Sequence, residues 1–217
     1  NPLTANRPNQ SMSVIYEQRL SNDRVWNVNP DNDSVSVFDA VSNAKLAEIP
    51  VKQSPHALAL APDGRIWVTN KHAASISVID PSSMAVTQLI SLPHASQPHG
   101  IVFSPDESYA YVALEASGQI IKLHPTSGAQ ISSALIGNNP RHLSINADGS
   151  AIYASQFVTP PIPGEATANV QTTVASIKYG GKVVKVTTAT MSVSKRIVLE
   201  HSERQDAEHS GRGIPNY

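Results

Sequence analysis

Cysteine is absent from the 217-residue chain, and several kinds of site are excluded with it. Disulfides, thiolate metal sites, a cysteine nucleophile and covalent c-type haem attachment all require cysteine, so none of them can lie within these residues. Charged residues make up only 15% of the chain and the formal net charge is -1, which gives no electrostatic reason to expect nucleic acid or an anionic membrane as a partner. No apolar run approaches the roughly 20 residues that would cross a bilayer, so we expect no membrane span.

The motifs of several enzyme classes are missing as well. The sequence has no GxSxG element, no Walker phosphate loop and no HExxH zinc motif. Asp31 and Asp33 form an Asp-x-Asp pair but lack the glycine and the distal glutamate of a calcium loop, so we interpret residues 29–34 as a connection between strands.

The residues that are abundant favour β structure. The polar fraction consists mostly of Ser, Thr, Asn and Gln, and valine and isoleucine are frequent. The low charge and the Ser/Thr/Asn richness favour an extracytoplasmic location, in the periplasm or at the cell surface. The chain starts at Asn1 rather than at Met, which fits a targeting segment that was removed or never included.

Three sets of residues recur with nearly the same spacing. Prolines and aspartates each recur at 43 and then 42 residues, and large aromatic residues recur at 41, 44 and 42 residues. The sets are Pro55, Pro98 and Pro140; Asp63, Asp106 and Asp148; and Trp26, Trp67, Tyr111 and Tyr153. Because a period of roughly 40–45 residues is the size of a four-stranded propeller blade, the sequence predicts an all-β propeller.

Each period divides into four short β runs separated by turn signals. In the second unit the runs are 56–61, 65–70, 75–80 and 85–90, and no apolar period of 3.6 residues indicates a long helix. In this interpretation the proline ends the incoming loop, the aspartate forms a tight turn, and the aromatic residue fills the core between neighbouring blades. About four blades are predicted, at 11–50, 56–91, 99–136 and 141–199, with the first inner strand at 11–16 and the start of a fifth at 215–217.

The segment 65–107 carries motifs of a known family. Residues 67–70 read WVTN, residues 77–80 read SVID and residues 98–100 read PHG. These motifs resemble the YVTN-type β-propeller repeat family of bacterial and archaeal surface and periplasmic proteins, most closely over residues 23–156. The resemblance implies a ring that has seven blades more often than not, of which these blades would be a part. It also implies roles as surface-layer proteins, as binding modules, or as partners of redox proteins, and residues 211–217 resemble a segment of relatives that carry cytochrome c or peroxidase-like domains.

The fourth repeat is longer than the others, and its extra residues can be located. Residues 118–136 match 181–199 without a gap, which places insertions at 157–181 and 200–214. Both connections belong to the face of the disc on which the inner strands begin. Long loops on one face of a rigid scaffold are typical of a working face. The first insertion could cover the mouth of the ring, act as an interaction loop, or be a disordered surface loop.

The candidate ligand-binding side chains lie on that face. They are His56, His99, Arg141, His201, Glu203, Glu208 and His209. The first three share one repeat position, so adjacent blades would present them side by side near the channel mouth; the alternative is that each imidazole bonds backbone and caps its strand. His142 is shifted by one place and is expected to face the sheet. The loop 200–209 contains donors that suit zinc, copper, manganese or iron, but a solvated polar loop is the preferred interpretation, and a metal site stays unknown.

Two functions of different classes follow. The first is an extracytoplasmic scaffold or binding module for a protein or small ligand, with no catalysis of its own; an anion or an acidic partner loop would suit the cationic candidates. The alternative is the non-haem propeller part of a bacterial redox enzyme that is linked to cytochrome c or to a peroxidase. No cofactor is then expected within this chain, and haem would lie in a missing domain. The expected partners are a protein or the remaining blades of the same propeller.

Overall fold

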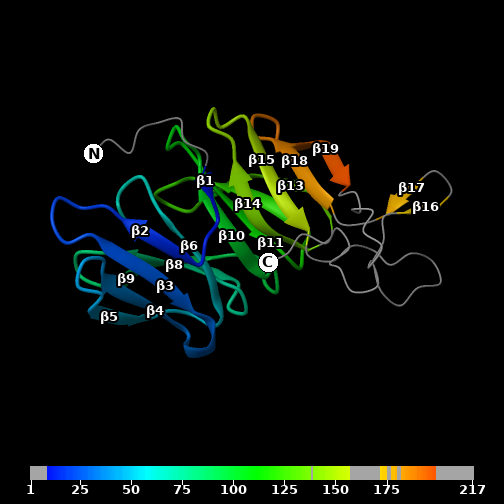
Figure 1. Cartoon of the computed structure of the whole chain (residues 1–217). Coiled ribbons are helices and arrows are strands. Elements are labelled where there is room, and N and C mark those ends of the chain that lie inside the picture. The colour runs from blue at the N-terminus through cyan, green and yellow to red at the C-terminus, as the bar shows by residue number, and fades with distance from the viewer. Residues whose placement is uncertain (1–8, 138, 157–171, 175–176, 180–181, 199–217) are drawn as a thin grey trace, which may run out of the picture.

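Four antiparallel four-stranded sheets follow one another along the chain (Figure 1). The computed structural model describes residues 9–137, 139–156, 172–174, 177–179 and 182–198. The sheets have the strand order of propeller blades, and the prediction of an all-β propeller with four blades is confirmed. The only helix among the described residues is the short 3-10 turn η1 (Pro30–Asn32), which connects two strands as the sequence predicted.

The strands of each blade pair in chain order. Blade I contains β2 (Val14–Glu17), β3 (Arg24–Asn29), β4 (Ser34–Asp39) and β5 (Lys45–Pro50). Blade II contains β6 (Pro55–Leu60), β7 (Ile66–Asn70), β8 (Ser75–Asp80) and β9 (Ala85–Ser91). Blade III contains β10 (Pro98–Phe103), β11 (Ala110–Leu114), β12 (Gln119–Leu123) and β13 (Gln130–Leu135). Blade IV contains β14 (Pro140–Ile145), β15 (Ala151–Gln156), β18 (Lys182–Thr187) and β19 (Ser192–Val198), and the short β1 (Asn9–Gln10) is added beside β14.

Aspartates form the turns between the first and second strands of three blades. A carboxylate oxygen of Asp63, Asp106 and Asp148 accepts the backbone N–H two residues later, at 3.1, 3.2 and 2.9 Å respectively. This is the hydrogen bond of an Asx turn, in which the side chain replaces a backbone acceptor. The role predicted for the three aspartates is therefore confirmed.

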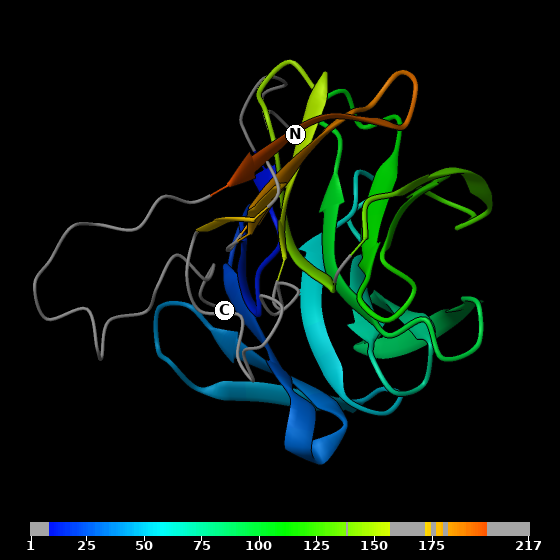
Figure 2. The same cartoon turned by 90° about the vertical axis from the view of Figure 1, so that its right-hand side faces the viewer.

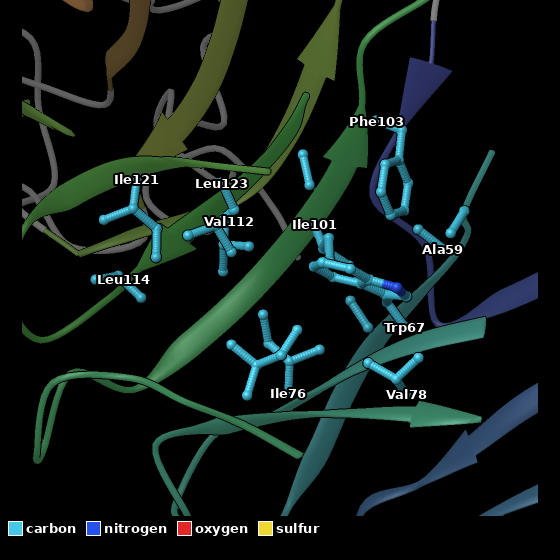
Figure 3. Close-up of a cluster of buried hydrophobic side chains, with 14 residues drawn as sticks. Ala59, Trp67, Ile76, Val78, Ile101, Phe103, Val112, Leu114, Ile121 and Leu123 are labelled. Atoms are coloured by element: carbon cyan, nitrogen blue, oxygen red, sulfur yellow. The ribbon is translucent and has the colours of Figure 1, made fainter. Parts of the chain in front are cut away.

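The hydrophobic core lies between the blades. Trp26, Trp67 and Tyr111 are at most 1% exposed, and each belongs to a different interblade cluster. Figure 3 shows the cluster between blades II and III, where the rings of Trp67 and Phe103 meet edge to face with centroids 5.3 Å apart. Truncating such a side chain to alanine costs about 3–5 kcal/mol in general, so these aromatics hold the blades together. Tyr153 is only half-buried, on the face of blade IV that points away from blade III.

One predicted strand is wrong in its bounds. The run 11–16 was expected to be the first inner strand, but β2 begins at Val14. Residues Asn9–Ser13, which we call the inner segment, instead run along the inner edges of other blades. Asn9 and Gln10 pair with β14, and Met12 bridges to Leu58 of β6. In Figure 2 this dark-blue segment lies between the cyan strand of blade II and the yellow-green strands of blade IV.

The described blades form an open arc. Neighbouring blades contact one another through their first strands, in the order β2 with β6, β6 with β10, and β10 with β14. β15 ends beside Pro140, so the insertion that follows it leaves from the face on which the inner strands begin. Within that insertion the structure describes the paired strands β16 (Thr172–Val174) and β17 (Ile177–Tyr179). The rest of it, the loop 200–214 and the predicted fifth strand at 215–217 lie outside the described residues.

Candidate functional site

Three inner strands begin with the same backbone arrangement. Pro55, Pro98 and Pro140 are the first residues of β6, β10 and β14. The residue before each proline has a positive φ, of 58° at Ser54, 54° at Gln97 and 42° at Asn139. Non-glycine residues with such φ values are uncommon, and they gather at functional sites and tight turns. This repeated turn fixes the direction in which the side chains after each proline leave the backbone.

Three imidazoles meet on this face of the arc. The ring of His99 lies between those of His56 and His142, with centroids 4.8 and 5.1 Å away and interplanar angles of 73° and 81°. We call these three residues the histidine cluster. It brings together the first strands of blades II, III and IV, and it places His56 beside His99 as the repeat predicted.

The expectation that His142 faces the sheet is wrong. Its ring lies edge-on to that of His99. The regular pairing of β14 with β15 is interrupted between Pro140 and Leu143. Because strict alternation of side chains fails where a strand is irregular, a shift of one residue in the sequence does not move the side chain to the other face.

Burial keeps the imidazoles neutral. His99 is 6% exposed, and this burial lowers its pKa to about 2, with further lowering from Arg141 and from His56 and His142 in their charged forms. Burial also lowers the pKa of His56 and of His142. His56 Nδ1 lies 3.1 Å from the carbonyl of Ser54, whereas His99 Nδ1 is buried without a hydrogen-bond partner among the described residues.

A carboxylate joins two cations beside the histidine cluster. Glu115 lies 2.8 Å from Lys71 Nζ and 3.1 Å from a terminal nitrogen of Arg141, and it is 6% exposed. We call these three residues the ion-pair bridge, since they come from blades II, III and IV. Burial acts to raise the pKa of Glu115, but the hydrogen bonds from Lys71 and Arg141 outweigh it and hold the pKa below its usual value. With neutral imidazoles, the histidine cluster and the ion-pair bridge together carry one net positive charge.

Sequence reasoning found Arg141 but missed its partners. Lys71 and Glu115 each follow the second strand of a blade and stand four residues after Trp67 and Tyr111. Opposite charges at one repeat position of adjacent blades were therefore a signal that could have identified them. His201, Glu203, Glu208 and His209 lie outside the described residues, so their predicted role stays a prediction.

Two hollows lie near the blade interfaces. One, of about 230 Å³, opens beside Lys71 and is lined by the loops 71–74 and 94–97. The other, of about 290 Å³, lies between blades III and IV at the aspartate turns. There the Lys122 ammonium stands 3.5 Å from the centre of the Tyr109 ring and 3.5 Å from the carbonyl of Thr188. Since Lys122 joins two blades in this way, we assign the second hollow to the interface between blades III and IV. The hollow beside Lys71 is the one that adjoins the histidine cluster and the ion-pair bridge.

The described residues contain no group of three His, Asp or Glu side chains arranged to hold a metal ion. Among the same residues there is also no helix with the length and apolar character needed to cross a membrane. The arrangement is therefore a polar mouth with one excess positive charge, built from neutral imidazoles and an ion-pair bridge.

The fold and the repeat define the chain as a β-propeller protein. Its family is identified by a family model: the chain belongs to the YNCE-like β-propeller family, which matches residues 13–194. This confirms the resemblance to the closely related YVTN-type repeat. No curated protein matches the chain at a significant level.

Several solved structures are similar to the chain. Hydrazine synthase from Kuenenia stuttgartiensis has 25% sequence identity and a TM-score of 0.66, over 83% of this chain and 47% of that one. Dihydro-heme d1 dehydrogenase NirN, in complex with DHE, has 16% identity and a TM-score of 0.60, over 86% and 37% of the two chains. A protein from Lactobacillus plantarum has 19% identity and a TM-score of 0.61, over 82% and 55%. The chain thus spans about half the length, or less, of these structures.

Proposed function

We propose that the chain is an extracytoplasmic propeller module that binds a protein or a small ligand at the histidine cluster, with no catalysis of its own. The observation that carries the proposal is the meeting of His56, His99 and His142 from three successive blades, beside a bridge of two cations and one carboxylate. Sites of this kind combine a rigid scaffold with a few convergent polar groups. Among the described residues, the histidine cluster and the ion-pair bridge carry one excess positive charge, and an acidic side chain or a small anion would suit this charge.

The buried nitrogen of His99 supports binding over strand capping. A capping histidine would satisfy its ring nitrogens with backbone groups, as His56 does with Ser54. His99 Nδ1 has no such partner among the described residues, and a buried polar atom without one costs about 1–3 kcal/mol. Most buried polar atoms in folded proteins have a partner, and a bound ligand would supply one for His99 Nδ1.

The test is the affinity for an acidic probe. We expect a hexaglutamate peptide, followed by calorimetry at pH 7, to bind the wild-type chain and to bind a His56→Ala, His99→Ala double variant at least tenfold more weakly. His94→Ala, an exposed histidine beside the neighbouring hollow, is the matched control and should bind like the wild type. If the double variant loses stability but binds unchanged, the histidines are strand caps and the proposed site is wrong.

Binding should also depend on pH in a defined direction. Because burial lowers the pKa of His56 and His142 from the ordinary 6.5, both stay neutral at pH 7 and gain charge only as the pH falls below 6.5. Affinity for the anionic probe should then rise as the pH is lowered below 6.5. His99 should contribute nothing to this rise, since its pKa is about 2.

The alternative is that the chain is the non-haem propeller part of a redox enzyme. The similarity to hydrazine synthase, at 25% identity over 83% of this chain, favours this candidate. Haem would then be held by a cytochrome c or peroxidase-like domain outside these residues. Reading the gene on both sides distinguishes the two: a CxxCH motif beyond these residues would support the redox assignment, and a surface anchor would support the binding module.

A further inference from the structure

One repeat position changes from apolar to charged between the second blade and the third. The residue directly opposite the large aromatic residue on the neighbouring strand is valine in blades I and II and lysine in blades III and IV. These residues are Val37, Val78, Lys122 and Lys185. The two valines are fully buried between blades, and Lys122 is buried as well, with 9% of its surface exposed. Blade III therefore places an ammonium group where the first two blades place methyl groups.

The Lys122 ammonium has few partners for a buried charge. It stands over the Tyr109 ring, and its hydrogen bond to the Thr188 carbonyl is long, at 3.5 Å, against about 2.7–3.2 Å for an ordinary bond of this kind. Among the residues that the structure describes, no carboxylate forms an ion pair with it. An ammonium carries three N–H donors, and a buried charge is costly unless it is well paired. Lys122 therefore has donors to offer to a further acceptor.

The ammonium borders the hollow of about 290 Å³ between blades III and IV, which we call the lysine hollow. Sites for small molecules measure roughly 300–1,000 Å³, so this hollow has room for one small ligand. Asp106 and Asp148 line it as well, from the turns of the two blades. Each carboxylate accepts one N–H within its turn, from Ser108 and Ser150 respectively, and a carboxylate has further acceptor sites. The lysine hollow thus combines hydrogen-bond donors with acceptors.

We infer that the lysine hollow binds a neutral ligand that carries several hydroxyl groups and has the size of a monosaccharide. The charges of the lining decide the class of ligand. Lys122, Asp106 and Asp148 together give one net negative charge, which disfavours a free anion, and a cation would be repelled by the buried ammonium. A hydroxyl group can accept from an ammonium and donate to a carboxylate, so a ligand with several hydroxyls satisfies both kinds of group.

This inference goes beyond the proposed function and concerns another place in the fold. The aspartate turn of blade III follows the end of β10, whereas Pro98 and the histidine cluster lie where that strand begins. None of the residues that line the lysine hollow belongs to the histidine cluster or to the ion-pair bridge. Either site can therefore fail without the other.

The test is the binding of three hexoses to the full chain and to two matched variants. Lys122→Met removes the ammonium and keeps the length of the side chain. Lys185→Met makes the same change opposite Tyr153, outside the lining of the hollow. The probes are D-glucose, D-galactose and D-mannose, added separately at pH 7. Binding is followed by the backbone amide signals of Gly149 and Thr188, which line the hollow, in ¹H–¹⁵N spectra.

We expect at least one of the three sugars to shift both amide signals and to saturate them, in the wild type and in Lys185→Met alike. The same sugar should bind Lys122→Met at least tenfold more weakly, because hydrogen bonds to charged groups contribute more than neutral ones. If no sugar saturates the wild type, or if the sugars bind Lys122→Met unchanged, the inference is wrong. Stronger binding of sodium acetate or of glycine would also overturn it, since the ligand would then be an anion or a zwitterion.

A second pair of variants covers the case in which Lys122→Met disturbs the interface. Asp148→Asn removes the charge but keeps a side-chain oxygen for the Ser150 N–H, and the residue is exposed, so the turn should persist. We expect this variant to bind the sugar several-fold more weakly. Asp63→Asn, the same change in the turn of blade II, should bind it like the wild type. Equal affinities in these two variants would contradict a role of the aspartate in the lysine hollow.

Discussion

His99 is the most buried member of the histidine cluster, and its position explains the chemistry of the whole mouth. Its neighbours are two imidazoles and the cations of the ion-pair bridge, so a proton on His99 would be both desolvated and repelled. The ring therefore stays neutral in the folded protein throughout the physiological range. A neutral imidazole can donate one hydrogen bond and accept another, which suits recognition of a polar group.

This neutral histidine makes stability depend on pH. In the unfolded chain His99 takes up a proton near its ordinary pKa of 6.5, but in the folded protein its pKa is about 2. Its contribution to stability is thus fully present above pH 6.5 and is lost as the pH falls. Between pH 6.5 and 5 the loss should reach about 2 kcal/mol, since each pH unit between the unfolded and folded pKa values costs about 1.36 kcal/mol. Urea unfolding across this range should show that the free energy of unfolding depends less steeply on pH in His99→Gln than in the wild type. The exposed control His94→Gln should depend on pH as steeply as the wild type, and equal slopes in all three proteins would contradict the burial argument.

At the scale of the strands, a repeated asparagine ties the second strand of a blade to the third. Asn70 ends β7, and its side-chain amide lies 3.2 and 2.9 Å from the hydroxyls of Ser75 and Ser77 on β8. Asn29 stands at the same place in blade I and contacts Ser34 and Ser36 at 3.0 and 2.9 Å. Asn70 is the last residue of the WVTN motif, so the motif supplies the side chain that connects the two strands of this hairpin.

The two asparagines differ in burial, and their substitution should differ in cost. Asn70 is fully buried, as are Ser75 and Ser77, so Asn70→Ala would leave buried polar groups without partners. We expect a loss of about 1–3 kcal/mol in the free energy of unfolding. Asn29 is only half-buried, and water can replace its amide, so Asn29→Ala should cost less. Chemical denaturation measures both, and a larger loss for Asn29→Ala would show that the hairpin contact is not what stabilises the blade.

Much of the arrangement of strands and turns could be predicted from the sequence, because it depends on local signals. The prolines, turn aspartates and interblade aromatics are set by their own position in a 42-residue repeat, and the structure confirms them for all but one aromatic residue. Tyr153 was expected in an interblade core, but it is half-buried, because no described blade covers the face of blade IV on which it lies. The inner segment could not be predicted, since its alternation suits a strand but does not say which strand is its partner. The ion-pair bridge was missed because Lys71 and Glu115 meet only when two blades are placed side by side. His142 was misplaced because an irregular strand breaks the alternation on which the prediction relied.

At the scale of the whole molecule, the described blades form an arc whose end faces are not covered by another blade. On β2, Ile15 packs into the core between blades I and II, so Val14 and Tyr16 point to the opposite face. These two side chains are 40% and 57% exposed. Apolar side chains gathered on one exposed sheet face favour association. We therefore expect the isolated chain to associate through this face.

The expected association can be tested by one substitution and its control. Val14→Lys places a charge on the uncovered face of blade I, and Val41→Lys makes the same change in a turn where the side chain is 83% exposed. Sedimentation velocity over a range of concentrations should show association for the wild type and for Val41→Lys, and less of it for Val14→Lys. A monodisperse wild-type monomer that melts cooperatively above about 60 °C, which is high for a mesophile domain, would contradict the prediction.

Locating the bound acidic probe shows directly whether this mouth of the propeller is the binding site. Long-range ¹H–¹⁵N correlation spectra resolve the imidazole signals of individual histidines, which single His→Gln substitutions assign. During titration with hexaglutamate at pH 7, we expect the signals of His56, His99 and His142 to shift together and saturate, while those of His72, His94 and His124 stay in place. Shifts confined to the latter three, or no shift at saturating peptide, would contradict the claim that this mouth of the propeller is its binding site.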